Sequence, residues 1–139
     1  MLNAANPEFL IMKDITTRKD IEKLMAAFYD TLLHDDAINY IFTDVAQINI
    51  TEHLPHIVDF WEQNLISHGN YSKNVLQIHL DLNGKTALTA NHFKIWLKHL
   101  NQTADSLFHG QNTEKLKTRA LSIATIMQIK LQENAQEIN

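Results

Sequence analysis

Residues that interrupt helices are scarce in this chain, and this scarcity limits the fold more than any other feature. Only three glycines and two prolines occur in 139 residues. Glycine and proline are the usual points at which helices and strands end. With so few of them, the chain is expected to fold into a small number of long helices.

Apolar residues recur at helical spacing in four segments, which predicts four amphipathic helices around one core. The expected starts are Thr17, Thr51 or Glu52, Thr89 and Thr113, and the expected ends are Asp35-Asp36, Gly69 and Gly110. Each long helix should contain roughly 18 residues and span about 27 Å. Because no strand-like alternation extends beyond four residues, the predicted class is all-α.

The start of the second helix can be interpreted in two ways. Asn49 and Glu52 have the spacing of a capping box, which favours an early start. Pro55 has no amide hydrogen and is best tolerated in the first turn, which favours a start near Thr51 or Glu52, or a kink there. We prefer the later start.

Two connections have no long periodic pattern. Residues Ala37 to Phe42 are expected to form a tight turn or a single helical turn. The longer connection, from Tyr71 to Leu88, is expected to be irregular apart from a short helix around Leu76 to Leu80. A connection of this length in a compact domain is usually functional.

Composition excludes several kinds of protein. The chain has no cysteine, so it has no disulfide, no thiolate metal ligand and no cysteine nucleophile, and a reducing cytoplasm is its expected location. The net charge is −4 without any long basic run, so no nucleic-acid partner is expected. No apolar stretch approaches the roughly 20 residues of a membrane helix. We expect one domain at 14–133, an N-terminal arm at 1–13 and a C-terminal tail at 134–139.

Eight histidines are many for a chain of this length. His79 lies in an apolar run, where a buried imidazole needs partners for both nitrogens, and a backbone carbonyl is the usual partner. His53 and His56 are three residues apart, as two zinc ligands can be, although this spacing is a weak zinc signature. His53 borders the apolar stripe, whereas His56 lies on the polar flank. The others are expected at helix ends or on solvated faces: His34, His68, His92, His99 and His109.

Three aromatic side chains are further candidates. Tyr29 follows Phe28 at the edge of the first apolar stripe, and a buried tyrosine hydroxyl must contact a carbonyl, a water or a ligand. Trp61 and Trp96 lie on inner helix faces, where most tryptophans only fill the core. Taken singly, these residues indicate no function.

Taken together and in order, these residues resemble the group III truncated haemoglobins, a bacterial family of two-over-two helical globins. The resemblance extends roughly from Asp14 to Leu131. The resembling segments are Phe28-Tyr29, Ile41-Phe42, His53-Leu54-Pro55, Phe60-Trp61-Glu62, Tyr71, His79-Leu80-Asp81-Leu82 and His92-Phe93-Lys94-Ile95-Trp96-Leu97.

The resemblance implies a b-type haem bound by residues from several segments. His79 would be the proximal iron ligand, and its other ring nitrogen would be oriented by a carbonyl. Phe42 and Ile57 would shape a dry pocket. The distal polar set would be Tyr29, His53 and Trp96. Ile78 precedes His79 where many family members have a polar partner for the haem propionates, so Tyr71 or Lys73 would take that role.

The same resemblance implies binding of dioxygen, nitric oxide and carbon monoxide at a pentacoordinate iron. A polar distal pocket favours dioxygen, nitric oxide or peroxide chemistry over bulk transport. The resemblance leaves open whether the chain is a nitric-oxide dioxygenase or a peroxidase-like enzyme that receives electrons from a reductase. It also leaves open whether His53 swings to admit ligands.

A second hypothesis is a haem-free helical module that binds a divalent metal through His53 and His56, or a partner helix through an amphipathic face. A hydrolase is disfavoured, because the chain has neither a nucleophile-elbow motif nor a phosphate-binding loop.

Overall fold

The computed structural model of the chain describes residues 12–45, 49–66 and 88–138, and within these ranges it is helical and contains no strand. The elements are α2 (Arg18–Leu33), the π-helical turn η1 (Ile41–Val45), α3 (Ile50–Leu65), α5 (Ala90–Leu107) and α6 (Gln111–Ile138). The predicted all-α class is therefore confirmed. Across the described ranges, no helix is long and apolar enough to cross a membrane.

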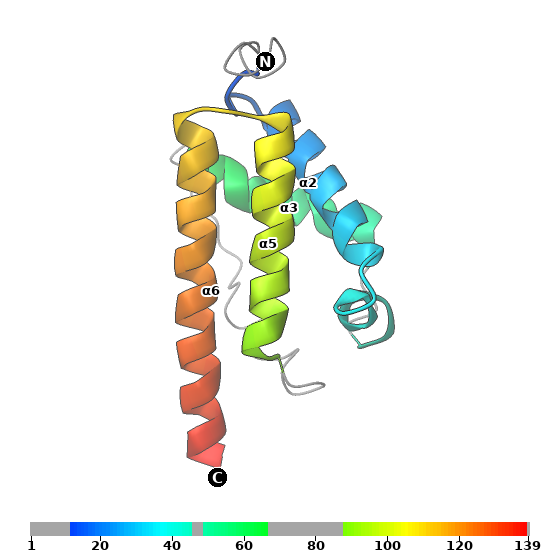
Figure 1. Cartoon of the computed structure of the whole chain (residues 1–139), viewed down its shortest axis with the longest axis vertical. Coiled ribbons are helices and arrows are strands. Elements are labelled where there is room, and N and C mark those ends of the chain that lie inside the picture. Colours follow the sequence, from blue (N-terminus) through cyan, green and yellow to red (C-terminus); the bar gives the residue numbers. More distant parts are fainter. Residues whose placement is uncertain (1–11, 46–48, 67–87, 139) are drawn as a thin grey trace, which may run out of the picture.

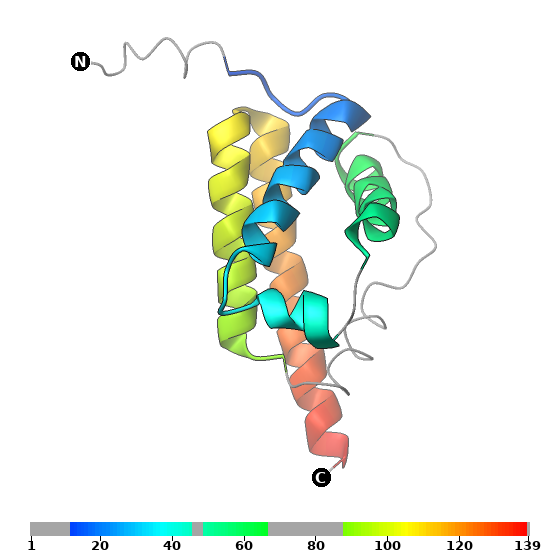
Figure 2. The ribbon, with the colours of Figure 1, turned by 90° about the vertical axis from the view of Figure 1, so that its right-hand side faces the viewer.

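The four α-helices form two packed pairs. Helices α5 and α6 lie side by side and run in opposite directions, and α2 crosses α5 at an angle (Figures 1 and 2). Helix α2 packs on both α3 and α5, and α3 also contacts α6. The pair α2/α3 thus lies over the pair α5/α6, which is the two-over-two arrangement expected from the sequence.

The inner face of α2 is the centre of the core. Its apolar residues recur every three or four positions, so they lie on one side of the helix. They are Ile21, Leu24, Met25, Phe28 and Leu32, all at most 2% exposed. Burying each such side chain contributes about 1.5 to 3 kcal/mol. The sequence pattern therefore identified the face that holds the two pairs together.

The start of α2, predicted at Thr17, is stabilised by a capping box. The Thr17 side chain accepts a hydrogen bond from the Asp20 amide, and Asp20 accepts one in return from the Thr17 amide. Burial would raise the pKa of Asp20, but hydrogen bonds from Lys13 and from the amides of Thr16 and Thr17 lower it well below its usual range. The charged carboxylate at this helix N-terminus is therefore strongly favoured.

The start of α6 differs from the prediction, which placed it at Thr113. The helix begins at Gln111, because its N-terminal groups are capped by Asp14 from the opposite end of the chain. The Asp14 carboxylate accepts hydrogen bonds from the amides of Asn112 and Thr113 at 2.8 and 2.9 Å, and from the Thr113 hydroxyl at 2.8 Å. No local pattern could reveal a cap separated by 98 residues.

Gly110 was expected to end α5, but the structure shows otherwise. Helix α5 ends at Leu107, and Gly110 lies just before α6 with a φ of 150°. A Cβ atom on this glycine would lie 2.6 Å from the Cβ of Asp14. Glycine is therefore required here by the backbone conformation and by the close approach of Asp14.

Helix α3 begins earlier than predicted. Asn49 is its N-cap and accepts hydrogen bonds from the amides of Thr51 and Glu52, at 3.0 and 3.4 Å. Pro55 lies inside the helix, so the preference for a later start was wrong. Because Pro55 has no amide hydrogen, it cannot donate the helical hydrogen bond to the carbonyl of Thr51. Thr51 is exposed, so water can bind this carbonyl instead.

The bounds of the other elements can also be compared with the prediction. Helix α3 ends at Leu65, before Gly69, which lies outside the described residues. The segment after α2 contains a turn and then η1, consistent with the short helical turn expected over Ala37 to Phe42. Helix α6 has 28 residues, more than the roughly 18 expected.

Candidate functional site

The structure brings three of the predicted pocket residues together, two from the distal set and Phe42. The Tyr29 ring on α2 contacts the ring of His53 on α3 at a centroid distance of 5.8 Å and an angle of 85°. It also contacts Phe42 on η1 at 6.0 Å and 87°. Edge-to-face contacts of this kind are the favoured geometry for aromatic pairs. Three segments of the chain therefore meet at the Tyr29 ring.

Trp96 is linked to these residues by Phe28, a residue for which the sequence had predicted no role in the site. The Phe28 ring lies 5.3 Å from Tyr29 and 5.9 Å from Trp96 on α5. Phe28 is 2% exposed, whereas Trp96 is half-buried. We call Phe28, Tyr29, Phe42, His53 and Trp96 the aromatic cluster. The adjacency of Phe28 to Tyr29 was the available signal, but their shared contacts depend on how α5 packs.

Tyr29 is the most deeply buried polar group of the aromatic cluster. Its side chain is 6% exposed, and no hydrogen bond from its hydroxyl is present among the described residues. Burial raises the pKa of Tyr29, so the hydroxyl remains protonated at neutral pH. It is therefore a hydrogen-bond donor in an apolar environment, where such a donor is costly unless something accepts its proton.

Ile57 lies one helical turn after His53 on α3. It is half-buried and packs against the main core, as does Phe42. This placement is compatible with the expected role of Ile57 in the wall of a pocket. His56 is exposed, as its position on the polar flank predicted, whereas His53 is half-buried.

The proximal half of the predicted site lies outside the described residues. This applies to His79, the expected iron ligand, and to Tyr71 and Lys73, the expected propionate partners. Their roles stay predictions. In the described ranges, no group of three or more His, Asp or Glu side chains could hold a metal ion.

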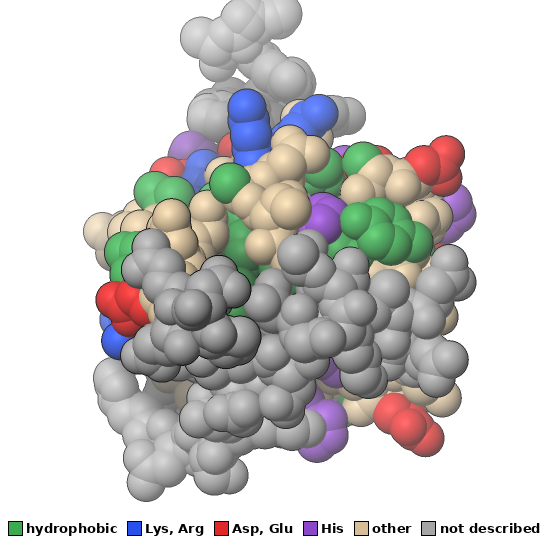
Figure 3. Space-filling view, turned by 90° about the horizontal axis from the view of Figure 1, so that it is seen from below, with side chains coloured by type: hydrophobic (Ala, Val, Ile, Leu, Met, Phe, Trp, Pro, Cys, Tyr) green, Lys and Arg blue, Asp and Glu red, His purple; other side chains and the backbone are tan. Residues whose placement is uncertain are grey.

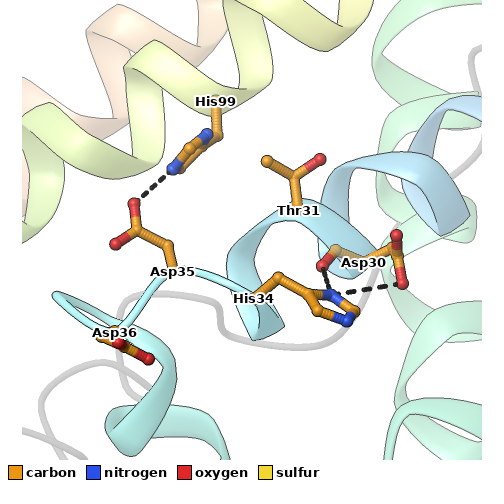
Figure 4. A pocket seen from close by; sticks show the side chains of 6 residues that line it. All are labelled: Asp30, Thr31, His34, Asp35, Asp36 and His99. Carbon is orange, nitrogen blue, oxygen red and sulfur yellow. Dashed lines mark hydrogen bonds and ion pairs between the residues drawn. The ribbon is translucent and has the colours of Figure 1, made fainter.

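An open surface depression lies at the end of α2, and its lining includes no residue of the aromatic cluster (Figure 4). It is lined by Asp30, Thr31, His34, Asp35, Asp36 and His99. The Nε2 atom of His99 lies 2.6 Å from an Asp35 carboxylate oxygen, and this hydrogen bond lowers the pKa of Asp35. His99 was expected to be solvated but is 13% exposed, because α5 packs beside the turn that carries Asp35. His34 contacts the Asp30 carbonyl at the end of α2, as expected.

A second histidine also has a role that its sequence position did not indicate. His92 Nδ1 accepts a hydrogen bond from the Thr89 amide at 3.0 Å and completes the capping box of α5. Its Nε2 lies 2.8 Å from the Tyr40 hydroxyl. Because Nδ1 accepts, the neutral ring carries its hydrogen on Nε2 and donates it to Tyr40. His92 thus joins the start of α5 to the segment that carries Phe42.

Figure 3 shows one end of the molecule. On this surface, charged side chains lie mostly toward the edge of the described part, and a histidine lies directly beside hydrophobic side chains.

The charged groups that join α2 to α3 are also peripheral. Arg18 binds Asp59 at 2.7 Å and Glu62 at 2.9 Å across these two helices. Such exposed pairs contribute little stability, and the aromatic cluster itself contains no charged pair among the described residues.

Comparisons with known proteins agree with this architecture. No protein-family model matches the chain. The group 3 truncated hemoglobin ctb of Campylobacter jejuni is 28% identical over 114 residues, which cover 80% of this chain and 87% of the relative. The crystal structure of a group III truncated hemoglobin from Campylobacter jejuni superposes with a TM-score of 0.74 at 27% identity, and the match covers 86% of this chain and 95% of that one. The chain therefore has the fold of the truncated haemoglobins, and its predicted resemblance to group III of that family is confirmed.

Proposed function

We propose that this chain is a haem protein that binds dioxygen and other diatomic molecules in a polar pocket formed around the aromatic cluster. One observation carries the proposal. In a truncated haemoglobin fold, the buried hydroxyl donor of Tyr29 lies beside His53 and Phe42, with no hydrogen bond of its own among the described residues. A small ligand with a polar atom would supply the missing acceptor.

The described residues are compatible with one wall of a haem pocket. Haem needs an apolar, largely water-free environment for its ring and a few polar groups for its ligand. The aromatic cluster supplies flat apolar rings from α2, η1 and α5, together with the donors of Tyr29 and Trp96. When bound, a haem would supply an iron at which a diatomic molecule can be held, and we propose His79 as its protein ligand.

The donors of the aromatic cluster favour chemistry over simple transport. A protonated Tyr29 and the Trp96 indole can both donate to a ligand that carries partial negative charge, and low local polarity strengthens these bonds. We therefore propose slow ligand release and a role in dioxygen, nitric oxide or peroxide chemistry. Phe42 and Ile57 would exclude water from the pocket, and a reductase would supply electrons for any turnover.

An absorption spectrum of the purified chain tests the proposal. We expect a Soret band in the ferric protein that shifts when the reduced protein binds carbon monoxide. In His79→Gly, the haem should be lost or weakly held, and added imidazole should restore it, because imidazole can replace the missing ligand. His56→Gly is the matched control, since His56 is an exposed histidine of a helix that carries the proposed pocket residue His53.

The absence of a Soret band after reconstitution with haem would overturn the proposal and favour the haem-free helical module. Zinc bound in place of iron porphyrin, and lost in His53→Ala, would lead to the same conclusion. An unchanged spectrum in His79→Gly would still support haem binding, but it would show that a residue other than His79 is the iron ligand.

A further inference from the structure

We infer that Asp35 and His99 are positioning residues of the proposed pocket, because their hydrogen bond orients the segment that places Phe42 against Tyr29. The inference rests on the proposed function and assigns a role in it to a pair outside the aromatic cluster. Asp35 lies in the connection between α2 and η1, and His99 lies on α5 (Figure 4). His99 Nε2 lies 2.6 Å from an Asp35 carboxylate oxygen, and it must donate, because an ionised carboxylate only accepts.

Asp35 also organises the backbone that follows it. Its other carboxylate oxygen accepts a hydrogen bond from the Ala37 amide at 2.9 Å. Its carbonyl accepts from the amides of Ile38 and Asn39, at 3.1 and 2.8 Å. Helical backbone then runs from Asn39 through η1, and we call residues 39–45 the η1 segment. Because Asp35 is bonded to three successive residues at its start, the η1 segment should follow any change in the orientation of Asp35.

Apolar contacts hold the η1 segment on the core but do not set its rotation. Ile38 and Ile41 are buried in the main core. Burial of apolar surface is non-directional, so it resists separation more than rotation. A hydrogen bond to a carboxylate is directional, and this one is shielded, since the His99 and Asp35 side chains are only 13% and 29% exposed. The Asp35–His99 pair can therefore set the rotation.

The rotation of the η1 segment matters because of Phe42. The Phe42 ring meets Tyr29 at an interplanar angle of 87°, and an edge-to-face contact depends on the orientation of both rings. Turns of π-helix such as η1 are rare and frequently occur at functional sites. His99 follows Trp96 by three residues, so both lie on one face of α5. One face of α5 thus carries a donor of the proposed pocket and the side chain that orients Phe42.

A second contact joins the η1 segment to α5, but it is less protected from water. The Tyr40 hydroxyl lies 2.8 Å from His92 Nε2, and Tyr40 is 37% exposed, so water can replace this hydrogen bond at little cost. Loss of the His99 donor instead leaves a partly buried carboxylate without its strongest partner. We therefore expect the Asp35–His99 pair to control the segment.

The rate of dioxygen release from the haem-loaded chain tests the inference. His99→Leu, which cannot donate to Asp35, should release dioxygen at least about twofold faster, a typical effect for a residue that acts through others. It should have no further effect in Tyr29→Phe, where no hydroxyl remains to be misplaced. His99→Gln should restore much of the wild-type rate, because its amide can donate to Asp35. His34→Leu is the matched control, since His34 lines the same depression but contacts Asp30 of α2.

A double-mutant cycle tests the same link without relying on haem. Urea unfolding of His99→Leu, Phe42→Leu and the double variant gives the coupling between the two sites. We expect a coupling of at least about threefold in the unfolding equilibrium constant, beyond the scatter of independent sites. If the chain binds no haem, the proposed function fails, but this cycle still tests the positioning link. Additive losses of stability, or an unchanged dioxygen release rate in haem-loaded His99→Leu, would overturn the inference.

Discussion

At the scale of single residues, Tyr29 places a polar hydroxyl among aromatic and apolar side chains. It is a protonated hydroxyl at a position where only 6% of the side chain is exposed. A donor in this environment is costly unless it finds an acceptor. The proposed ligand would supply that acceptor, and the role of Tyr29 can be measured by removing only its oxygen.

We predict that Tyr29→Phe releases dioxygen faster than the wild type. One hydrogen bond contributes about 1 kcal/mol, and more in a water-poor site, so the dissociation rate should rise by about fivefold to tenfold or more. Stopped-flow or flash photolysis measures the rate. Tyr40→Phe is the matched control, because it also loses one hydroxyl, but from a side chain that is 37% exposed and bonded to His92. An unchanged rate in Tyr29→Phe would remove the proposed role of the hydroxyl.

His92 is expected to make the chain less stable in mild acid. Its Nδ1 accepts from the Thr89 amide, and burial lowers the pKa of His92 below its usual value of 6.5. The unfolded chain therefore binds this proton more readily than the folded chain as the pH falls. The contribution of the neutral ring is complete above about pH 6.5 and decreases below it, toward the lower folded-state pKa.

The matched variant is His92→Gln, whose amide oxygen can accept from the Thr89 amide without titrating in this range. Urea unfolding between pH 8 and pH 5 should show a smaller loss of stability in His92→Gln than in the wild type. If both proteins lose the same stability, another group causes the acid sensitivity.

At the scale of elements, the start of α6 depends on a contact between two ends of the chain. We predict that Gly110→Ala lowers the free energy of unfolding by about 1 to 3 kcal/mol, because alanine disfavours a φ of 150° and its Cβ would meet Asp14. Chemical denaturation measures the loss. The substitution should cost less in an Asp14→Gly background, which removes both the Cβ and the carboxylate that the new side chain would meet but keeps the backbone part. Additive effects of the two substitutions would show that the contact with Asp14 does not matter.

At the scale of the whole molecule, the two helix pairs should respond differently when haem is removed. Helices α5 and α6 pack directly on each other, whereas α3 contacts α2 and α6, and carries half-buried apolar residues that include Leu54, Ile57 and Phe60. Removing a cofactor lowers the stability of the parts of the chain that it contacts.

We therefore predict faster hydrogen exchange in α3 than in the α5/α6 pair after haem is removed. Exchange mass spectrometry of the haem-loaded and haem-free chain measures this difference. The first turns of α6, held by Asp14, provide an internal reference that should change little. A uniform increase in exchange across all helices would contradict the proposed location of the pocket.

Much of the molecule could be predicted from local patterns alone. Apolar spacing identified the inner face of α2, and Thr17 and Thr89 were correctly predicted as the starts of their helices, because a capping box is completed within three residues. The order of the short aromatic and histidine segments was sufficient to indicate the family resemblance. What these features share is that the atoms involved are close in sequence.

The tertiary structure decided the contacts between distant segments. The Asp14 cap of α6, the Asp35–His99 pair and the meeting of Tyr29, Phe42 and His53 each depend on how helices pack after the chain has turned. Apolar periodicity indicates which face of a helix is buried but not which residue lies opposite, because the turns and crossing angles between helices determine that. The sequence by itself therefore determined the helices and their buried faces, and only their packing decided which side chains meet at the site.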